Sequence, residues 1–358
     1  MIQLKRKMKQ LTKRQQYIYS LIQSKGPVSN NEIRNYSGNI FENVSRVTIT
    51  RDIAKLLSLK LIIKKGAGRS TVYKDISKKI LLKKIDPFIY FNIEPDYRTI
   101  IENFNFHIFN EFYDELFDEQ ELLLLEKLTN KYQNNIANIS PEILKKDTER
   151  LTIELSWKSS QIEGNTYSLL DTEALFKEKR EAPGHDKSEA IMLINHKKSL
   201  EYILKKPLDY TNLTIRKIED IHRILVEGLS IEFGLRNSLV SITGSKFKPL
   251  SNQQQIKESL EKTFDIINNY NDPFHKTLIL IAMLSYIQPF IDGNKRTARI
   301  SGNAILSAYN ACPLSYRSVD SVEYKKAMLL FYEQNSLYYF KKLFMEQYEF
   351  SVNNYFCQ

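Results

Sequence analysis

The sequence of 358 residues has few of the residues that build covalent or metal-based frameworks. It contains two cysteines, Cys312 and Cys357, which lie far apart and have no Cys or His close by in the sequence. We therefore expect neither a disulfide framework nor a zinc site, and a reducing, cytoplasmic compartment is the default.

The sequence also lacks a long apolar run. No window approaches the roughly 18 consecutive apolar residues that cross a bilayer, so no membrane partner is expected. The first 16 residues include basic side chains but no apolar segment of the kind found in signal peptides. Hydrophobic content of 42% and charged content of 26% fit a soluble globular protein with room for two or three domains.

Negative charge is scarce at the start of the chain. Residues 1–85 hold 20 Lys and Arg but only 4 Asp and Glu, whereas the remainder holds 32 and 38. A strongly basic unit thus precedes a mildly acidic body. Such a unit suggests a polyanionic partner, usually nucleic acid, although a lysine-rich solvated surface would give the same count.

Residues 1–80 have the pattern of a small DNA-binding domain. Apolar spacing predicts helices at 11–23, 30–35 and 45–57, followed by a β-hairpin with a Gly-Ala-Gly turn. This order resembles the winged helix-turn-helix of bacterial transcription regulators, most clearly from Thr48 to Ile62.

The resemblance implies that the third helix enters the major groove and that the hairpin contacts phosphate. The residues it assigns to DNA lie on the outer face of that helix or on the hairpin: Arg46, Thr48, Arg51, Lys55, Lys64, Lys65 and Arg69. Many winged helices bind other proteins instead, and the sequence leaves that alternative open.

The remainder of the chain has the pattern of a helical body. Residues 81–112 form a connector rich in Phe and Tyr, which we expect to pack on the body. Amphipathic spacing predicts helices at 111–132, 141–160, 171–179, 187–204, 214–228, 252–269, 273–286, 294–309, 321–331 and 336–350. Residues 237–247, between Gly234 and Pro249, are the exception and are predicted to form a short β-hairpin.

The most informative segment is QPFIDGNKRTARI at residues 288–300. A turn at Asp292-Gly293-Asn294 opens a helix whose first turns carry Lys295, Arg296 and Arg299. Cations at a helix start oppose the helix dipole, so together with the free backbone N–H groups they indicate an anionic ligand. Asp292 would repel a phosphate unless a divalent metal such as Mg²⁺ joined them. An ordinary basic helix start is the alternative.

This segment resembles the Fic signature, H-P-F-x-[DE]-G-N-[GK]-R-x-x-R, at every defined position except the first. The Fic family transfers the AMP moiety of ATP to a Ser, Thr or Tyr hydroxyl of a target protein. The resemblance implies a mainly α fold at residues 113–350, a Fic-type helical bundle with a short β-hairpin flap, next to the small α/β winged-helix domain. It assigns Mg²⁺ to Asp292, the phosphates to Gly293, Asn294, Lys295 and Arg296, and the γ-phosphate to Arg299, with Asn294, Arg296 and Arg299 counted as catalytic.

Two further segments extend the resemblance. Ser159, Glu163 and Gly164 fit the family's inhibitory pattern, [ST]-x-x-x-E-[GN], on a helix at about 141–165. The resemblance implies that Glu163 pairs with the last arginine of the signature and keeps the γ-phosphate from seating. Without the signature, Glu163 would be interpreted as a solvated side chain.

The second segment, residues 234–249, is similar to the Fic flap, along which a target chain adds as a strand. The resemblance places Gly244, Ser245 and Phe247 at the nucleotide or at the target bound along 237–247.

Gln288 stands where the signature has histidine. That histidine removes the proton of the target hydroxyl, a contribution of typically ~10²–10⁴-fold. A carboxamide neither accepts a proton at useful pH nor becomes charged. We therefore expect nucleotide binding to persist and transfer to be impaired.

Lys295 is a second departure, because glycine is more common at its position. Lysine also occurs there in the branch of the family that phosphorylates its targets, but that branch lacks the final arginine. Arg299 is present in this chain, which favours adenylylation.

The ligands implied are ATP and Mg²⁺. The partners implied are a protein target and, through the winged helix, DNA. A homodimer is the alternative to a monomer. Two functions fit this sequence. One is a protein adenylyltransferase inhibited by Glu163 and weakened by Gln288. The other is a degenerate Fic domain that senses nucleotide and regulates a DNA-binding winged helix.

Overall fold

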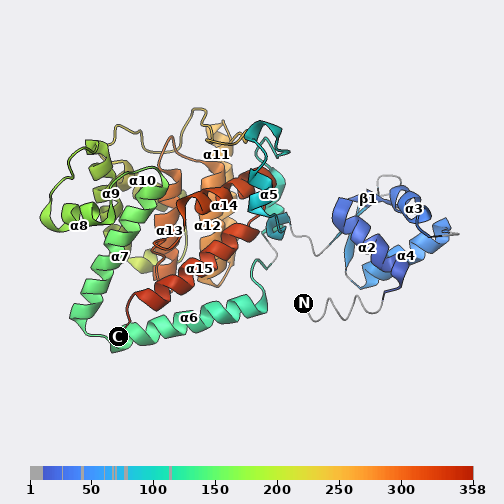
Figure 1. The fold of residues 1–358 in the computed structure, drawn as a ribbon, viewed down its shortest axis with the longest axis horizontal. Coiled ribbons are helices and arrows are strands. Elements are labelled where there is room, and N and C mark those ends of the chain that lie inside the picture. The colour runs from blue at the N-terminus through green and yellow to red at the C-terminus, as the bar shows by residue number, and fades with distance from the viewer. Residues whose placement is uncertain are drawn as a thin grey trace. The chain divides into compact units, whose positions relative to one another are not determined.

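The computed structural model describes residues 11–25, 27–41, 44–59, 61–66, 68, 71–75, 80–112 and 115–357. The chain divides into two compact units, residues 1–79 and 80–358, each considered by itself (Figure 1). Among the described residues, no helix is long and apolar enough to cross a membrane. Arg69, one of the residues predicted to contact DNA, lies outside the described part of the chain.

In its described part, the first unit combines three helices with a small sheet. Its elements are α2 Lys13–Lys25, β1 Val28–Ser29, α3 Asn30–Gly38, α4 Arg46–Ser58, β2 Ile62–Lys65 and β3 Val72–Asp75. The strands are antiparallel in the order β1-β3-β2. Serines fix the starts of two helices, because Ser29 caps α3 in a capping box and Ser45 caps α4.

One buried carboxylate joins two helices of this unit. Asp52 of α4 accepts hydrogen bonds from Arg14 at 2.6 Å and from Gln15 at 2.9 Å, both in α2. Beneath this contact lies an apolar core to which α2, α3, α4 and the sheet all contribute. The pairing of Asp52 thereby turns one side of α4 inward and leaves the opposite side in solvent.

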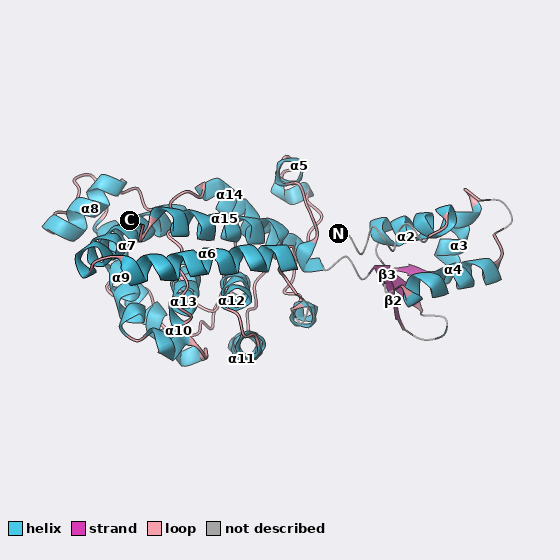
Figure 2. Cartoon of the chain, turned by 90° about the horizontal axis from the view of Figure 1, so that it is seen from below, coloured by secondary structure: helices cyan, strands magenta, loops and turns pink. Residues whose placement is uncertain are grey.

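The regular elements of the second unit's described part are all helices, joined by loops (Figure 2). Its elements are η2 Ile80–Leu82, α5 Pro87–Phe91, η3 Pro95–Tyr97, η4 Phe106–Glu111, α6 Glu119–Asn138, α7 Pro141–Ile162, α8 Leu169–Glu178, α9 Lys187–Lys205, η5 Pro207–Tyr210, α10 Ile215–Val226, α11 Gln253–Asn269, α12 Pro273–Ile287, α13 Asn294–Ala308, α14 Ser321–Gln334 and α15 Tyr338–Asn354. The mainly helical fold with a small α/β unit, expected from the sequence, is confirmed; the sheet of that unit has three strands where the sequence predicted a two-stranded hairpin.

Helix α12 forms the centre of this unit. Every residue from Phe274 to Ile287 is buried, as expected for a helix that is apolar on all sides. Helices α11, α13 and α14 pack around it, and α6 and α15 run side by side across one face (Figures 1 and 2). Aromatic residues of the segment before α6, including Phe104, Phe109 and Phe112, belong to the same core.

Two predicted elements differ in the structure. The helix predicted to begin at residue 111 begins at Glu119, because Asp118 caps it in a capping box with Glu121. The β-hairpin predicted at 237–247 is wrong, since these residues form an irregular loop with a single turn at Thr243-Gly244.

The loop at 237–247 has a physical reason to stay open. The buried Arg236 guanidinium binds the carbonyls of Ser238, Leu250 and Gln288, and the Lys248 N–H donates to the Glu102 carbonyl. These contacts hold the two arms of the loop to other parts of the unit. The arms are therefore not paired with each other as strands.

Candidate functional site

The segment 288–293 is a tight turn between the two central helices. Gln288 ends α12 in the left-handed region with φ of 51°, and Gly293 precedes α13 with φ of 78°. A Cβ on Gly293 would approach side-chain atoms of His222 and Val226 at 3.5 Å. Glycine therefore suits this position by its positive φ, whereas neighbours at 3.5 Å lie at an ordinary van der Waals distance.

The start of α13 is uncapped by any side chain. In an α-helix the first N–H groups have no partner within the helix. The first backbone bond of this helix runs from the Thr297 N–H to the Gly293 carbonyl at 2.9 Å. The N–H groups of the preceding residues, 294–296, thus face the turn, where the positive end of the helix dipole favours an anion.

The side chain of Asn294 closes the turn on itself. Its carboxamide accepts from the Phe290 N–H at 2.8 Å and donates to the Phe290 carbonyl at 2.8 Å and to Gln288 Oε1 at 3.0 Å. With its polar atoms used inside the loop, Asn294 can offer a ligand its backbone N–H rather than its side chain.

Arg296 lies beneath this turn with 2% of its surface exposed. Its Nη2 donates to Asp292 Oδ2 at 3.1 Å, while Nε and Nη1 are buried without a hydrogen-bond partner among the described atoms. Burial lowers the pKa of this guanidinium, but arginine remains charged at neutral pH. A buried cation with two unsatisfied donors is costly unless an anion completes it.

Arg299 and Glu163 form a buried ion pair. Arg299 Nη2 donates to Glu163 Oε1 at 2.9 Å, and the guanidinium also binds the Ser159 hydroxyl and carbonyl at 2.8 Å each. The second carboxylate oxygen of Glu163 accepts from Lys295 at 3.3 Å. The structure thus brings Ser159 and Glu163 of α7 to Arg299 and Lys295 of α13.

The charges around Glu163 favour its ionised form. Burial alone raises the pKa of this carboxyl, but the attraction of Arg299 and Lys295 outweighs it, so its pKa lies below the usual value. For Arg299, burial opposes the charge and Glu163 favours it, and the net pKa is raised. At neutral pH the carboxylate therefore acts as a fixed anion between two cations.

A cleft of about 400 Å³ opens beside these groups. It is lined by the turn and the start of α13, by the end of α7, by α14 and by part of the open loop: Ile162, Glu163, Val240, Ser241, Ile242, Thr243, Gln288, Ile291, Asp292, Gly293, Asn294, Lys295, Arg296, Tyr324, Lys325, Met328, Leu329 and Tyr332. Asp292 is the most accessible charged group at the turn, with 61% of its side chain exposed.

Gln288 borders the cleft but is engaged elsewhere. Its Nε2 donates to the Ser285 carbonyl at 2.7 Å, and its Oε1 accepts from Asn294. The carboxamide therefore supports the turn, and its two polar atoms point to neighbours of the chain.

His222 lies beside the turn, although no sequence pattern predicted it there. Its ring stacks on Phe290 with centroids 3.7 Å apart, and Nε2 donates to the Asp292 carbonyl at 3.0 Å. Burial lowers the pKa of His222 to about 4. The residue lies 66 positions before Gln288 in the sequence, on an ordinary amphipathic helix, so no local pattern connects it to the loop.

The three residues assigned to the nucleotide or target do not line the cleft. Gly244 has φ of 77° and its carbonyl accepts from Arg98, while the Ser245 hydroxyl accepts from the Phe247 N–H at 3.1 Å. Phe247 is buried and stacks on Tyr286. The preceding residues, 240–243, are the ones that border the cleft.

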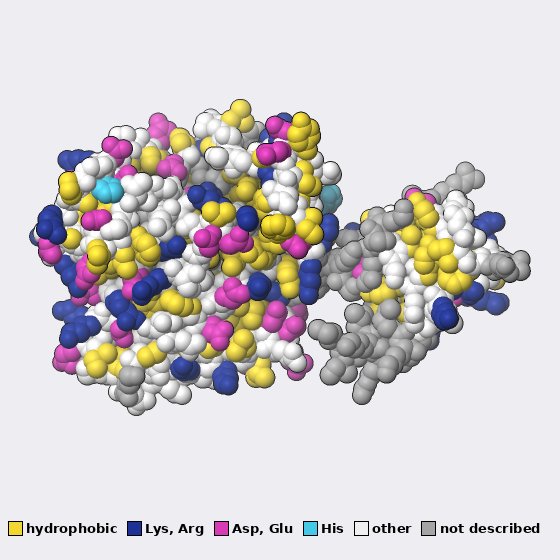
Figure 3. Space-filling model, in the orientation of Figure 1, with side chains coloured by type: hydrophobic (Ala, Val, Ile, Leu, Met, Phe, Trp, Pro, Cys, Tyr) yellow, Lys and Arg dark blue, Asp and Glu magenta, His cyan; other side chains and the backbone are white. Residues whose placement is uncertain are grey.

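The residues assigned to DNA gather on the outside of the first unit. Arg46, Arg51 and Lys55 of α4 are exposed, as are Lys64 and Lys65 of β2. Thr48 is half-buried, with its hydroxyl 2.9 Å from that of Ser45 at the helix cap. Figure 3 shows dark-blue Lys and Arg side chains at the surface of this unit.

Comparisons with known proteins find similarity to Fic proteins within the second unit. The Fic/DOC family profile matches residues 212–306. The chain is 32% identical over 178 residues to protein adenylyltransferase Fic of Nematostella vectensis and 30% identical over 153 residues to protein adenylyltransferase fic-1 of Caenorhabditis elegans. These stretches are 47% and 40% of this chain, and they span only 40% and 30% of the two relatives.

Solved structures share the fold. A Fic-domain signalling protein of Bacteroides thetaiotaomicron has a TM-score of 0.55 at 21% identity, covering 64% of this chain and 94% of that one. A fragment of Fic-1 from Caenorhabditis elegans has a TM-score of 0.53 at 21% identity, covering 66% and 72%. With the sequence profile that matches residues 212–306, these structures show that the second unit has the fold of Fic-domain proteins.

Proposed function

We propose that the chain binds ATP in the cleft beside α13 and that its chemistry is the transfer of AMP to a protein hydroxyl. The observation that carries the proposal is Arg296, a buried cation with two unpartnered N–H groups at the positive end of a helix. Such an arrangement fits the phosphates of a nucleotide. The named activity of the matching relatives supports adenylyl transfer in particular.

Asp292 would hold Mg²⁺ in this proposal. No group of three or more His, Cys, Asp or Glu side chains suited to a metal occurs among the described residues. Mg²⁺ in phosphoryl chemistry is commonly bound by one or two carboxylates together with the phosphates and water, so a single accessible carboxylate beside an anion site fits. The ion would neutralise charge on the phosphates.

In the transfer, the oxygen of the target hydroxyl bonds to the α-phosphorus as the bond to pyrophosphate breaks, and the hydroxyl proton must leave. Arg296 and the N–H groups at the start of α13 would stabilise the charge that develops on the phosphates. The described residues that line the cleft include no histidine to take the proton. Slow transfer, or none, is therefore expected with Gln288 in the base position.

Glu163 would inhibit the same site. Its carboxylate lies between Lys295 and Arg299, the two cations assigned to phosphates. A triphosphate that used both cations would have to displace it. The exposed backbone of the loop at 237–247, with Leu239 80% exposed, would receive the target chain.

Restoring the base tests this proposal. The full chain, Gln288→His and Gln288→His with Glu163→Gly are incubated with Mg²⁺, a bacterial lysate and ATP labelled on the α-phosphate. We expect the double variant to label protein ~10²–10⁴-fold faster than the parent chain, the range of a positioned base. Gln288→Asn is the matched control and should add nothing. Absence of labelling by the double variant would reject the transferase.

A second function is favoured by the exposed cations of the first unit. Arg46, Arg51 and Lys55 share the solvent side of α4, and no acidic residue lies between them except Asp52, which is buried against α2. We infer that this unit is a winged helix that binds duplex DNA, with α4 in the major groove. The nucleotide cleft would then regulate a DNA-binding protein.

Salt dependence of DNA affinity tests this second function. Binding of a random-sequence duplex to the full chain should weaken steeply as salt rises. Arg46→Gln and Arg51→Gln should each lower the affinity and the salt slope, while Lys13→Gln in α2 serves as the control. Equal affinities for all four proteins would rule out α4 as the contact.

A further inference from the structure

The position of Glu163 depends on the residues that come after it in the chain. Helix α7 ends at Ile162, Glu163 is its C-terminal cap, and Gly164 turns the chain away with φ of 102°. A helix end is the part of a helix that frays most readily. The contact of Glu163 with Arg299 therefore needs support from residues beyond the helix.

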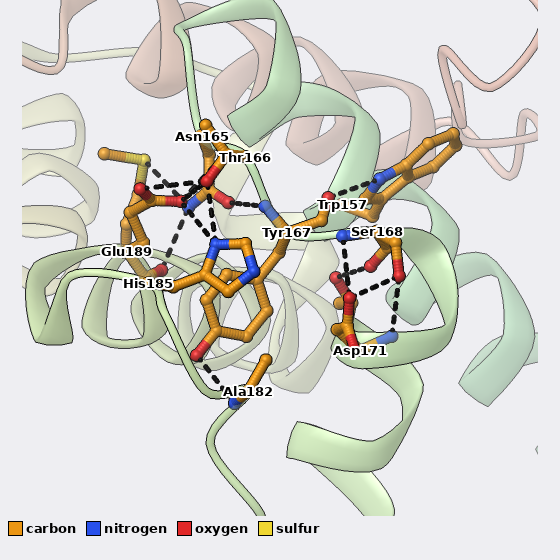
Figure 4. Close-up of polar contacts among 11 residues, drawn as sticks. Trp157, Asn165, Thr166, Tyr167, Ser168, Asp171, Ala182, His185 and Glu189 are labelled. Atoms are coloured by element: carbon orange, nitrogen blue, oxygen red, sulfur yellow. Dashed lines mark hydrogen bonds and ion pairs between the residues drawn. The ribbon is translucent and has the colours of Figure 1, made fainter.

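That support comes from four residues that we call the Thr166 cluster: Asn165, Thr166, His185 and Glu189. The Thr166 N–H donates to Glu189 Oε2 at 2.7 Å, and its hydroxyl lies 2.8 and 3.1 Å from the two oxygens of that carboxylate. The same hydroxyl lies 2.8 Å from His185 Nδ1, and Asn165 Nδ2 donates to the Glu189 carbonyl at 3.0 Å. Figure 4 shows these side chains converging.

A second set of contacts fixes the next residue. Tyr167 is buried against Leu175, Ala190 and Leu193. Its carbonyl accepts from Trp157 Nε1 at 3.0 Å, and its hydroxyl accepts from the Ala182 N–H at 3.2 Å. Residues 165–167 are thus bound to the first turn of α9 and to the segment before it, while the helix end that carries Glu163 lies directly upstream.

We propose that Thr166 and Glu189 are positioning residues that hold Glu163 between Lys295 and Arg299. The inference rests on the proposed inhibitory role of Glu163. Neither Thr166 nor Glu189 lines the cleft, so both act through the backbone of residues 163–166. Loss of the cluster frees the end of α7, and the anion site between the two cations becomes available to a triphosphate.

Triphosphate affinity of the full chain tests this. The probe is the ATP analogue with an NH group between its β- and γ-phosphates, measured by calorimetry with Mg²⁺, and AMP is the second ligand. Thr166→Val and Glu189→Gln should each raise analogue affinity about three- to tenfold, as expected when a competing closed state is depopulated. Affinity for AMP, which has no γ-phosphate to reach Arg299, should change less than about twofold.

Two comparisons separate positioning from a general loss of structure. Glu163→Gln should raise analogue affinity, and adding Thr166→Val to it should bring no further gain. Glu173→Gln, in the exposed pair with Lys177 on α8, is the matched control and should leave the affinity unchanged. Hydrogen exchange of the backbone amides at residues 163–166 should become faster in Thr166→Val and in Glu189→Gln. Because two variants test the same role, the test remains possible if one of them folds poorly.

The outcomes distinguish the positioning role of Thr166 and Glu189 from the inhibitory role of Glu163. If Glu163→Gln raises analogue affinity but Thr166→Val and Glu189→Gln do not, the positioning role is wrong and the inhibitory one stands. A gain in the double variant beyond Glu163→Gln alone also overturns the inference. If no variant binds the analogue, the proposed nucleotide site itself is wrong.

Discussion

Single side chains in the turn between α12 and α13 have uses that a motif does not specify. Asn294 is part of the matching signature, yet its carboxamide binds the backbone of Phe290 and the side chain of Gln288. Gln288 in turn donates to Ser285. The replacement at the signature's first position is therefore built into the hydrogen bonding of the loop.

His222 gives a residue-scale prediction on pH. Burial lowers its pKa from 6.5 to about 4, so between these values the unfolded chain takes up a proton that the folded chain does not. The contribution of neutral His222 to the free energy of unfolding is complete above pH 6.5 and is lost as the pH falls toward 4. Chemical denaturation should show that His222→Gln loses less stability between pH 7 and 4.5 than the parent chain, by about 2 kcal/mol at most.

The control for this prediction is His107→Gln, which changes an exposed histidine. It should reproduce the pH dependence of the parent chain. The fully buried His196, whose pKa is also lowered by burial, remains in both variants. It therefore still contributes to the dependence of stability on pH. An unchanged slope in His222→Gln would mean that folding does not lower the pKa of His222.

At the scale of elements, the open loop is held by one arginine rather than by strand pairing. Arg236 is 2% exposed and binds carbonyls from both arms of the loop and from Gln288. Backbone atoms of the loop that border the cleft at 240–243 are thereby left without a paired strand. This is the condition that a loop needs if it is to accept a strand from a partner.

Removing Arg236 should loosen both the loop and the turn. Arg236→Met leaves several buried carbonyls unpaired and should cost about 3 kcal/mol of stability. For a unit of this size that corresponds to a fall in the melting temperature of roughly 6–12 °C by calorimetry. Arg216→Met, an exposed arginine of α10, is the control. A melting temperature equal to that of the control would show that the carbonyls find other partners.

For the whole molecule, the division into two units separates two kinds of chemistry. All residues of the cleft lie in the unit of residues 80–358, and the exposed cations of α4 and β2 lie in the other. Each unit has its own apolar core. Separate cores are what allow domains to fold independently.

Residues 80–358 expressed alone should therefore keep the cleft. We expect the fragment to fold and to bind the imido analogue of ATP with an affinity within about twofold of the full chain, since no cleft residue is removed. Calorimetry measures both properties. A fragment that unfolds or loses the analogue would show that the first unit contributes to the site.

The sequence by itself determined the features that depend on neighbours along the chain. The turn and helix start at 292–299, the missing histidine and the apolar spacing of the helices are all local, and local patterns specify turns, caps and amphipathic faces. The signature also pointed from Glu163 to Arg299, but only through resemblance to a family, because the long stretch of chain between them offers no local link.

Only the tertiary structure decided which distant side chains meet. His222 reaches the turn because α10 packs against α13, and Glu189 reaches Thr166 because α7, α8 and α9 pack together. The predicted hairpin failed for the same reason, since its carbonyls at Ser238 and Gly244 bind Arg236 and Arg98, and the Lys248 N–H just beyond it donates to Glu102. Contacts between elements depend on how their faces pack in three dimensions, and one segment's residues do not contain that information.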